Sequence, residues 1–212
     1  ERRLHHHIPV SDSFDYPVSQ YYEEVLSFLA EEFIGSSRWL NASLVLASQE
    51  QSIEILSLPF VKKVAPLHGS ESISSSLAKV DEAELENIRR YQVGTLGSRT
   101  LRRLQASGKG IRIAVLDGGF PGVDKHPGFE HIIARNKIKA TWNFPRNSEN
   151  VYRDNDHGTS VLSCISGFMN ERATGLASDA EFLLARTELE REPWKEQLYW
   201  IQAAEWADKN GA

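Results

Sequence analysis

Cysteine and methionine are almost absent from this sequence, which has one of each among its 212 residues. The single cysteine, Cys164, excludes an internal disulfide. Long apolar runs are also lacking, and none approaches the roughly 20 residues that a membrane-spanning helix needs. Basic residues are not in excess either, since the net charge is -5. The chain therefore has no electrostatic footprint for nucleic acid or for an anionic membrane, and neither is predicted as a partner.

The chain does contain enough apolar material for a substantial core. Hydrophobic residues make up 41% of it, and this length allows one large domain or two small ones. It starts with Glu1-Arg2-Arg3, without the charged start, apolar middle and cleavage site of a signal peptide, which is compatible with a leader that has already been removed. Residues 1–17 are predicted to be an extended arm. The adjacent histidines His5 to His7 in this arm lack the spacing of a closed metal site.

An aspartate follows the most strand-like stretch of the sequence. Residues Ile111 to Leu116 are apolar and rich in β-branched side chains, and they are followed by Asp117 and the pair Gly118-Gly119. This pattern predicts a buried strand with a carboxylate at its C-terminal end. Parallel α/β sheets build sites just outside the carboxyl ends of their strands, so Asp117 is a candidate site residue.

A histidine begins the second informative stretch. From His157 to Gly167 small residues alternate with apolar ones, which predicts a tightly packed helix with His157 in its first turn. An aspartate that accepts a hydrogen bond from one imidazole nitrogen fixes the tautomer and leaves the other nitrogen free to take a proton from a nucleophile. Asp117 and His157 could therefore supply two members of a catalytic triad.

Both stretches resemble the motifs of one enzyme family. Asp117-Gly118-Gly119 and His157-Gly158-Thr159 are similar to the aspartate and histidine motifs of the subtilisin-like serine proteases, or subtilases, in the same chain order. The resemblance implies a serine endopeptidase that hydrolyses a polypeptide substrate through an Asp-His-Ser triad. It places the serine after Ala212, so the chain alone is expected to be inactive. Because many subtilases are exported, it also favours a secreted or cell-envelope location.

The chain departs from the common subtilase pattern at three positions. Gly118 stands where serine or threonine is usual, and Ser160 stands where a second histidine is usual; neither change touches the mechanism. Gly128 stands where many subtilases have an aspartate that ligates calcium. The resemblance makes a structural calcium possible, but Gly128 does not support it, and no other metal or cofactor is predicted.

Residues 18–68 are predicted to form a small α+β module. Apolar residues at three- and four-residue spacing as far as Phe33, with Ser19 as N-cap and Gly35 as the closing residue, indicate a helix. Ahead of a subtilase domain, such a module resembles the propeptide of these enzymes, which assists folding and inhibits the peptidase domain until it is cleaved. The alternative is an unrelated α+β domain.

Three further elements complete this module. Strands are expected at Trp39–Ala47 and Phe60–Pro66, on either side of a helix from Gln49 to Leu58. The spacing of Ile53, Leu56 and Leu58 predicts that these side chains face inward.

The second half of the chain is predicted to be the N-terminal part of a peptidase domain, residues 98–212, joined by a linker at 69–97. Within the linker, the small polar run Gly69–Ser76 marks the boundary. The elements expected here are helices at Thr100–Leu104 and Trp194–Lys209 and strands at Lys137–Phe144 and Ala180–Ala185. Together with the strand before Asp117 and the helix that starts at His157, these strands and helices alternate along the chain. The alternation predicts an α/β fold: a parallel sheet with helices on both faces, truncated at Ala212.

Five other residues that could act as ligands, acids or nucleophiles are predicted to have structural roles only. These are His126 and His131 as loop residues, Asp154 and Asp156 as solvated carboxylates in the polar loop 145–156, and Cys164 as an inert core residue.

Two alternative functions belong to different classes. An aspartate after a buried strand is also the phosphoacceptor of receiver domains and of haloacid-dehalogenase-like phosphatases. Those phosphatases need a second aspartate two residues later, where this chain has Gly119, and receivers need an acidic pair on an earlier strand, which the segment before Ile111 lacks. The other alternative is a non-catalytic subtilase relative that binds polypeptides without cleaving them.

Overall fold

The computed structural model describes residues 15–67, 87, 91, 93–169, 172–189 and 193–212. These form two units: the residues up to 67 together with 193–206, and the residues from 87 to 189 together with 207–212. The predicted arm at 1–17 and the linker at 69–97 lie largely outside the described residues, as do His5 to His7. The domain boundaries stay a prediction.

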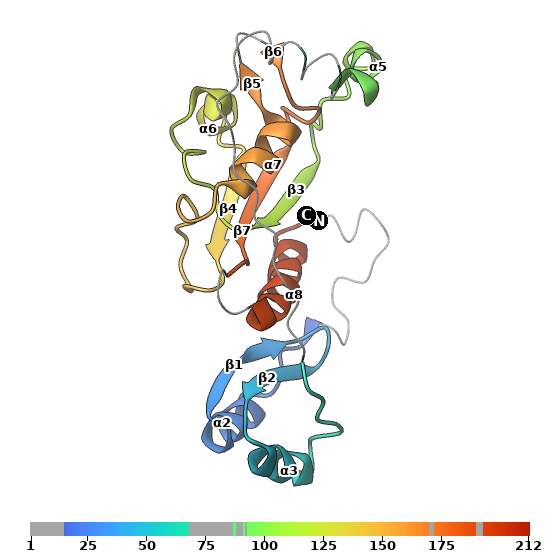
Figure 1. Ribbon diagram of the computed structural model, residues 1–212. Helices are drawn as coiled ribbons and strands as arrows, with labels where there is room; N and C mark the ends of the chain where they lie inside the picture. The colour runs from blue at the N-terminus through green and yellow to red at the C-terminus, as the bar shows by residue number, and fades with distance from the viewer. Residues whose placement is uncertain (1–14, 68–86, 88–90, 92, 170–171, 190–192) are drawn as a thin grey trace. The chain divides into compact units, whose positions relative to one another are not determined.

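The larger unit is built on a parallel sheet, as the alternation of elements predicted. Strands β3 (Arg112–Asp117), β7 (Glu181–Arg186) and β4 (Ile138–Asn143) lie in the order β3-β7-β4, all parallel (Figure 1). In the central strand β7, every side chain from Phe182 to Ala185 is fully buried. Since successive side chains point to opposite faces, both faces of β7 are covered, which explains its unbroken apolar sequence.

An apolar core packs against one face of this sheet. It joins Val115 and Leu184 of the sheet to Ile132 of helix α6 (Glu130–Ala134) and Leu162 of helix α7 (His157–Ser166). Each fully buried side chain of this kind contributes about 1.5–3 kcal/mol. The remaining elements of this unit are helix α5 (Ser98–Arg103), the short 3-10 helix η3 (Pro127–Phe129) and the antiparallel pair β5 (Phe168–Met169) and β6 (Arg172–Ala173).

The polar loop 145–156 is held closely against the core. Val151 is fully buried, and its carbonyl accepts the backbone N–H of Phe120 at 2.8 Å. Burial, followed by the charge of Asp124, raises the pKa of Tyr152 above its usual value. This segment, which connects β4 to the histidine helix α7, is called the histidine loop below.

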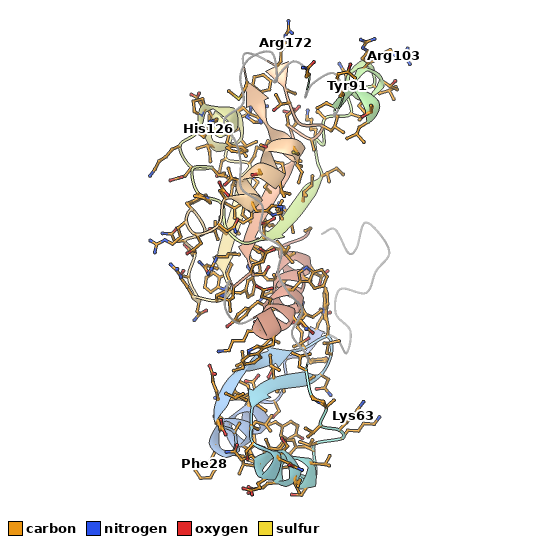
Figure 2. The ribbon with its side chains drawn as sticks, in the orientation of Figure 1. Phe28, Lys63, Tyr91, Arg103, His126 and Arg172 are labelled. Carbon is orange, nitrogen blue, oxygen red and sulfur yellow. The ribbon has the colours of Figure 1, made fainter. Side chains whose placement is uncertain are left out.

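The smaller unit begins with a helix and an antiparallel strand pair. Helix α2 (Gln20–Leu29) starts after Ser19, as predicted, and Phe28 on it projects away from the ribbon, 88% exposed (Figure 2). Strand β1 (Glu32–Ser37) then pairs with β2 (Ala42–Leu46). The prediction that the helix continues through Phe33 to Gly35 is therefore wrong, because both residues lie in β1.

Two other predictions for this unit need correction. Helix α3 (Gln49–Ser57) is confirmed, with a capping box between Ser48 and Gln51, but Ile53 and Leu56 are exposed and Ile55 is the buried residue. The expected strand at Phe60–Pro66 has no regular structure. The strand expected at Trp39–Ala47 is shorter, since a turn occupies its first residues.

Helix α8 (Pro193–Lys209) supplies the rest of the smaller unit, and β1 packs on it. A side chain on Gly35 would approach the Gln202 amide to 2.9 Å and Leu198 to 3.4 Å. The end of the Gln202 side chain could move aside, but Gly35 has a φ of 153°, a backbone conformation that favours glycine, so glycine is required here by the strand and not as the end of a helix.

The carboxylate of Glu205 on α8 forms polar contacts with the end of β1 and the turn after it. It is buried, accepts hydrogen bonds from Ser37 Oγ at 2.5 Å and from the Trp39 backbone N–H at 3.2 Å, and lies 3.5 Å from the Arg38 guanidinium. Lys195 adds an ion pair with Glu32 at 3.0 Å. Glu205 therefore fastens the turn that follows β1.

The end of α8 lies in the larger unit and is closed by hydrogen bonds of the Schellman type. Gly211 donates its N–H to the Asp208 carbonyl at 2.9 Å, and Ala212 donates to the Ala207 carbonyl at 3.0 Å. The predicted cap at Asn210-Gly211 is confirmed. In the described part of the chain, no helix is both long enough and apolar enough to cross a membrane.

His131 was predicted to be a loop residue, but it lies in α6 and packs on the Phe168 ring, with 5.2 Å between ring centroids. Its two ring nitrogens are buried, and among the described residues neither has a hydrogen bond of normal geometry. Burial, and after it the positive charge of Arg135, lowers the pKa of His131; the Ser166 backbone and Asp179 partly offset this. The folded protein therefore favours the neutral imidazole.

His131→Phe should make the protein less sensitive to acid. Because the folded-state pKa lies below 6.5, the unfolded chain takes up this proton first as pH falls, so the free energy of unfolding decreases below about pH 6.5. Phenylalanine keeps the ring contact and removes the titration. The difference in Tm between H131F and wild type should increase as the pH is lowered from about 7 to about 5, and the corresponding difference for R135Q should increase less. An advantage that stays constant over this range would contradict the argument.

Candidate active site

Asp117 stands at the C-terminal end of β3, where the sequence predicted a buried carboxylate. Its side chain is 6% exposed, and its Oδ1 accepts the backbone N–H of Gly118 at 2.7 Å. A buried carboxylate needs such donors, because burial removes the water molecules that hydrate the charge and only hydrogen bonds from the protein can replace them.

His157 is the first residue of α7, and it faces Asp117. Its Nδ1 lies 3.0 Å from each carboxylate oxygen of Asp117. Since an ionised carboxylate only accepts hydrogen bonds, we assign the proton to Nδ1, which leaves Nε2 as the acceptor. The imidazole is 41% exposed whereas the carboxylate is buried. The pair therefore has an orienting carboxylate inside and a proton-accepting imidazole open to solvent, as general-base chemistry requires.

Gly158 allows the helix to come this close to the strand. A side chain at this position would begin 2.3 Å from the Gly119 carbonyl oxygen and 2.9 Å from Asp117 Cβ, both far inside contact distance. Glycine at 158 thus sets the separation between α7 and the end of β3, and with it the separation of His157 from Asp117.

Hydrogen bonds of Asn155, just before α7, and of Thr159, within it, orient the first turn of the helix. Asn155 Oδ1 accepts the backbone N–H of His157 at 2.8 Å, and Thr159 Oγ1 donates to the Pro121 carbonyl at 2.9 Å. The sequence interpretation missed Asn155, although an asparagine two residues ahead of a helix's first N–H is a recognisable turn signal. It also missed the buried Arg186, for which no local pattern exists.

The other candidate residues lie apart from the pair or have structural partners. His126 caps η3 through the Gly128 N–H, with Nδ1 accepting at 3.0 Å. Asp154 and Asp156 are exposed loop residues, as expected, and Arg146 pairs with the Asp154 carboxylate at 2.7 Å. Cys164 was expected in the core and is exposed. Gly128 has no side-chain oxygen, so this position does not supply the carboxylate ligand of the calcium site that the family resemblance suggests.

The serines of α7 all hydrogen-bond within their own helix. Ser160 Oγ donates to the Asp156 carbonyl at 3.1 Å, Ser163 to Ser160 at 2.7 Å and Ser166 to Leu162 at 3.2 Å. Their hydroxyls are therefore engaged with backbone carbonyls, which is the usual behaviour of serine inside a helix.

Comparison with known families agrees with this site. Residues 108–212 match the subtilase family, peptidase S8, and residues 1–84 match the peptidase S8 propeptide domain of Bacteroidota. The chain therefore carries a subtilase-family domain preceded by a peptidase S8 propeptide domain. No curated protein matches the chain. Membership of the subtilase family implies a serine peptidase, and the phosphoryl-transfer alternative is set aside.

Gly158→Ala should disrupt the pair. The added methyl group forces α7 away from β3, so we expect a loss of roughly 1–3 kcal/mol in stability and about a 100-fold fall in kcat from displacement of His157. Both are measured in a protein with the complete catalytic domain, by thermal unfolding and peptide hydrolysis. Ser160→Ala, on the same helix, is the control and should change neither. A G158A enzyme with wild-type kcat would show that this contact does not position His157.

Proposed function

We propose that this protein is a subtilisin-type serine endopeptidase in which Asp117 and His157 are two members of the catalytic triad. The observation that supports this most directly is the pairing of His157 Nδ1 with the buried Asp117 carboxylate at 3.0 Å, in a domain of the subtilase family. The substrate is a polypeptide.

In the proposed mechanism His157 moves protons and Asp117 keeps it oriented. As the serine Oγ attacks the peptide carbonyl carbon, its proton passes to His157 Nε2. The same proton is then given to the leaving amine as the C–N bond breaks, which leaves an acyl-enzyme. A water molecule repeats the sequence and frees the serine. Throughout, Asp117 stays ionised and stabilises the imidazolium through the Nδ1 hydrogen bond.

We assign the nucleophile to none of the serines in α7. Ser160, Ser163 and Ser166 share the helix of His157 and donate to its backbone carbonyls, so no hydroxyl among them is directed at Nε2. The proposal places the nucleophilic serine outside residues 1–212, and residues 1–212 alone should neither hydrolyse peptides nor react with a fluorophosphonate. By the same family inference, the enzyme acts outside the cytoplasm, secreted or in the cell envelope.

The propeptide is proposed to inhibit the peptidase domain until it is cleaved, and to be held in place through α8. The polar contacts that support this are those of Glu205 with Ser37 and Trp39, and of Gln202 Nε2 with the Ser36 carbonyl at 3.0 Å. A buried carboxylate that accepts hydrogen bonds from both a side chain and the backbone holds these segments firmly together. Removing either partner would leave a buried polar group without a hydrogen bond.

His157→Ala tests the proposed triad. In a protein with the complete catalytic domain, loss of the general base should lower kcat by about 10⁴-fold or more, and Asp117→Asn should also lower it strongly, because the amide does not stabilise the imidazolium. Peptide hydrolysis and fluorophosphonate labelling are the measurements. His126→Ala is the matched control, since it removes a histidine that caps η3 and contacts Phe129 and is not part of the pair. Turnover of H157A near the wild-type rate would exclude His157 from the triad.

Glu205→Ala should shorten the time for which the cleaved propeptide stays bound. Without the Glu205 carboxylate, the Trp39 N–H and the Ser37 hydroxyl lose their acceptor. Loss of a buried charged partner of this kind weakens binding by about 2–5 kcal/mol. The fraction of cleaved propeptide that co-elutes with the peptidase domain, and the delay before activity appears, both report this. Lys195→Met is the comparison: its pair with Glu32, whose side chain is 50% exposed, should matter far less. Equal release from both variants would refute the role of Glu205.

A further inference from the structure

A buried arginine ends the central strand of the sheet, directly beside the proposed catalytic pair. Arg186 is 7% exposed and is the last residue of β7. In the parallel register it stands between Asp117 of β3 on one side and Asn143 of β4 on the other. A guanidinium is always charged at physiological pH, so its burial needs a counterion and hydrogen-bond acceptors.

The guanidinium first contacts the turn at the end of β3, residues 117–119, which is called the aspartate turn below. Arg186 Nε donates to the carbonyl of Gly118 at 3.0 Å, and Gly118 is the residue whose own N–H is donated to Asp117 Oδ1. The backbone supports the same arrangement, since the Thr187 N–H is donated to the Asp117 carbonyl at 2.9 Å. The two peptide units that follow Asp117 are therefore both held by the neighbouring strand: the first through Thr187 and the second through Arg186.

The second group is the histidine loop. Arg186 Nε lies 3.3 Å from Asp154 Oδ2, and Arg146 pairs with the other oxygen of the same carboxylate at 2.7 Å. Asp154 precedes His157 by three residues, and it forms an isolated bridge with Gly119. The counterion of the buried guanidinium is thus part of the segment that leads into α7.

Asn143 completes the arrangement at the start of that loop. Its side chain is fully buried, accepts from Arg186 Nη1 at 3.3 Å and donates to the Asn150 carbonyl at 3.0 Å. A single guanidinium therefore contacts the aspartate turn, the end of β4 and the histidine loop. Its planar fork of donors suits three acceptors in fixed directions, which one ammonium group at the end of a flexible stem does not reproduce.

We propose that Arg186 is a positioning residue for the catalytic pair: it holds the Gly118 peptide and Asp154 in fixed places, and thereby sets the distance between Asp117 and His157. The proposal rests on the proposed function of that pair. The hydrogen bond between Asp117 and His157 depends on the relative position of the aspartate turn and the histidine loop. Because Arg186 contacts both segments, its charged side chain has an indirect role in catalysis.

The test compares Arg186→Lys, which keeps the charge, with Arg186→Met, which keeps the approximate length alone. In a protein with the complete catalytic domain, R186M should lower kcat about 100-fold and R186K about tenfold, with KM within about threefold of wild type, as expected for displacement of reacting groups by a fraction of an ångström to an ångström. The NMR resonance of the His157 Nδ1 proton should shift or broaden in both variants.

Arg112→Met is the matched control. Arg112 pairs with Glu181 at 2.6 Å, on the same two strands but at their opposite ends, so R112M should lower thermal stability and leave kcat and the Nδ1 resonance unchanged. If R186M fails to fold, R186K decides. An R186K enzyme with wild-type kcat and resonance, or an equal loss of kcat in R112M, would overturn the proposal. If instead H157A keeps full turnover, the proposed function itself fails, whatever the Arg186 variants do.

Discussion

The close approach of a helix to the end of a strand is the constraint on which this site depends. At Gly158 there is no room for a single methyl group between α7 and the turn after Asp117. Because a helix can be placed so tightly only through glycine, the identity of residue 158 fixes the 3.0 Å separation of His157 Nδ1 from the Asp117 carboxylate. The chemistry of the pair thus follows from packing before it follows from charge.

The same site depends on the central strand at a second level. The run from Phe182 to Ala185 is buried on both faces and gives β7 no freedom to shift, so the residue at its end is held equally firmly. Arg186 uses this rigidity to reach carbonyl and carboxylate groups in two different loops. A charged residue at the end of an apolar strand is costly, and it is tolerated because each donor direction meets a fixed acceptor.

How far the sequence predicts this structure depends on how local the determining interactions are. Strands β3 and β7 could be predicted because each contains an uninterrupted apolar run, and Asp117 and His157 because each ends or begins a predicted element in a recognised order. Strand β1 could not, since Phe33 continues the helical spacing of α2. Its strand conformation comes from pairing with the neighbouring strand β2 and from packing on α8, which is distant in the sequence.

Glu205 and Arg186 show why some residues that hold the structure together could not be predicted from the local sequence pattern. Glu205 lies within a helical period and Arg186 directly after an apolar run, and either position would suit a solvated charge at an element's surface. Each is instead buried, and each is satisfied by groups that are distant in sequence: Ser37 and Trp39 for Glu205, Gly118 and Asp154 for Arg186. Burial of a full charge is favourable only when such partners are already in place. Charged residues of this kind therefore mark the points at which separate segments of the chain must be brought to fixed positions, and in this protein one of those points adjoins the proposed catalytic pair.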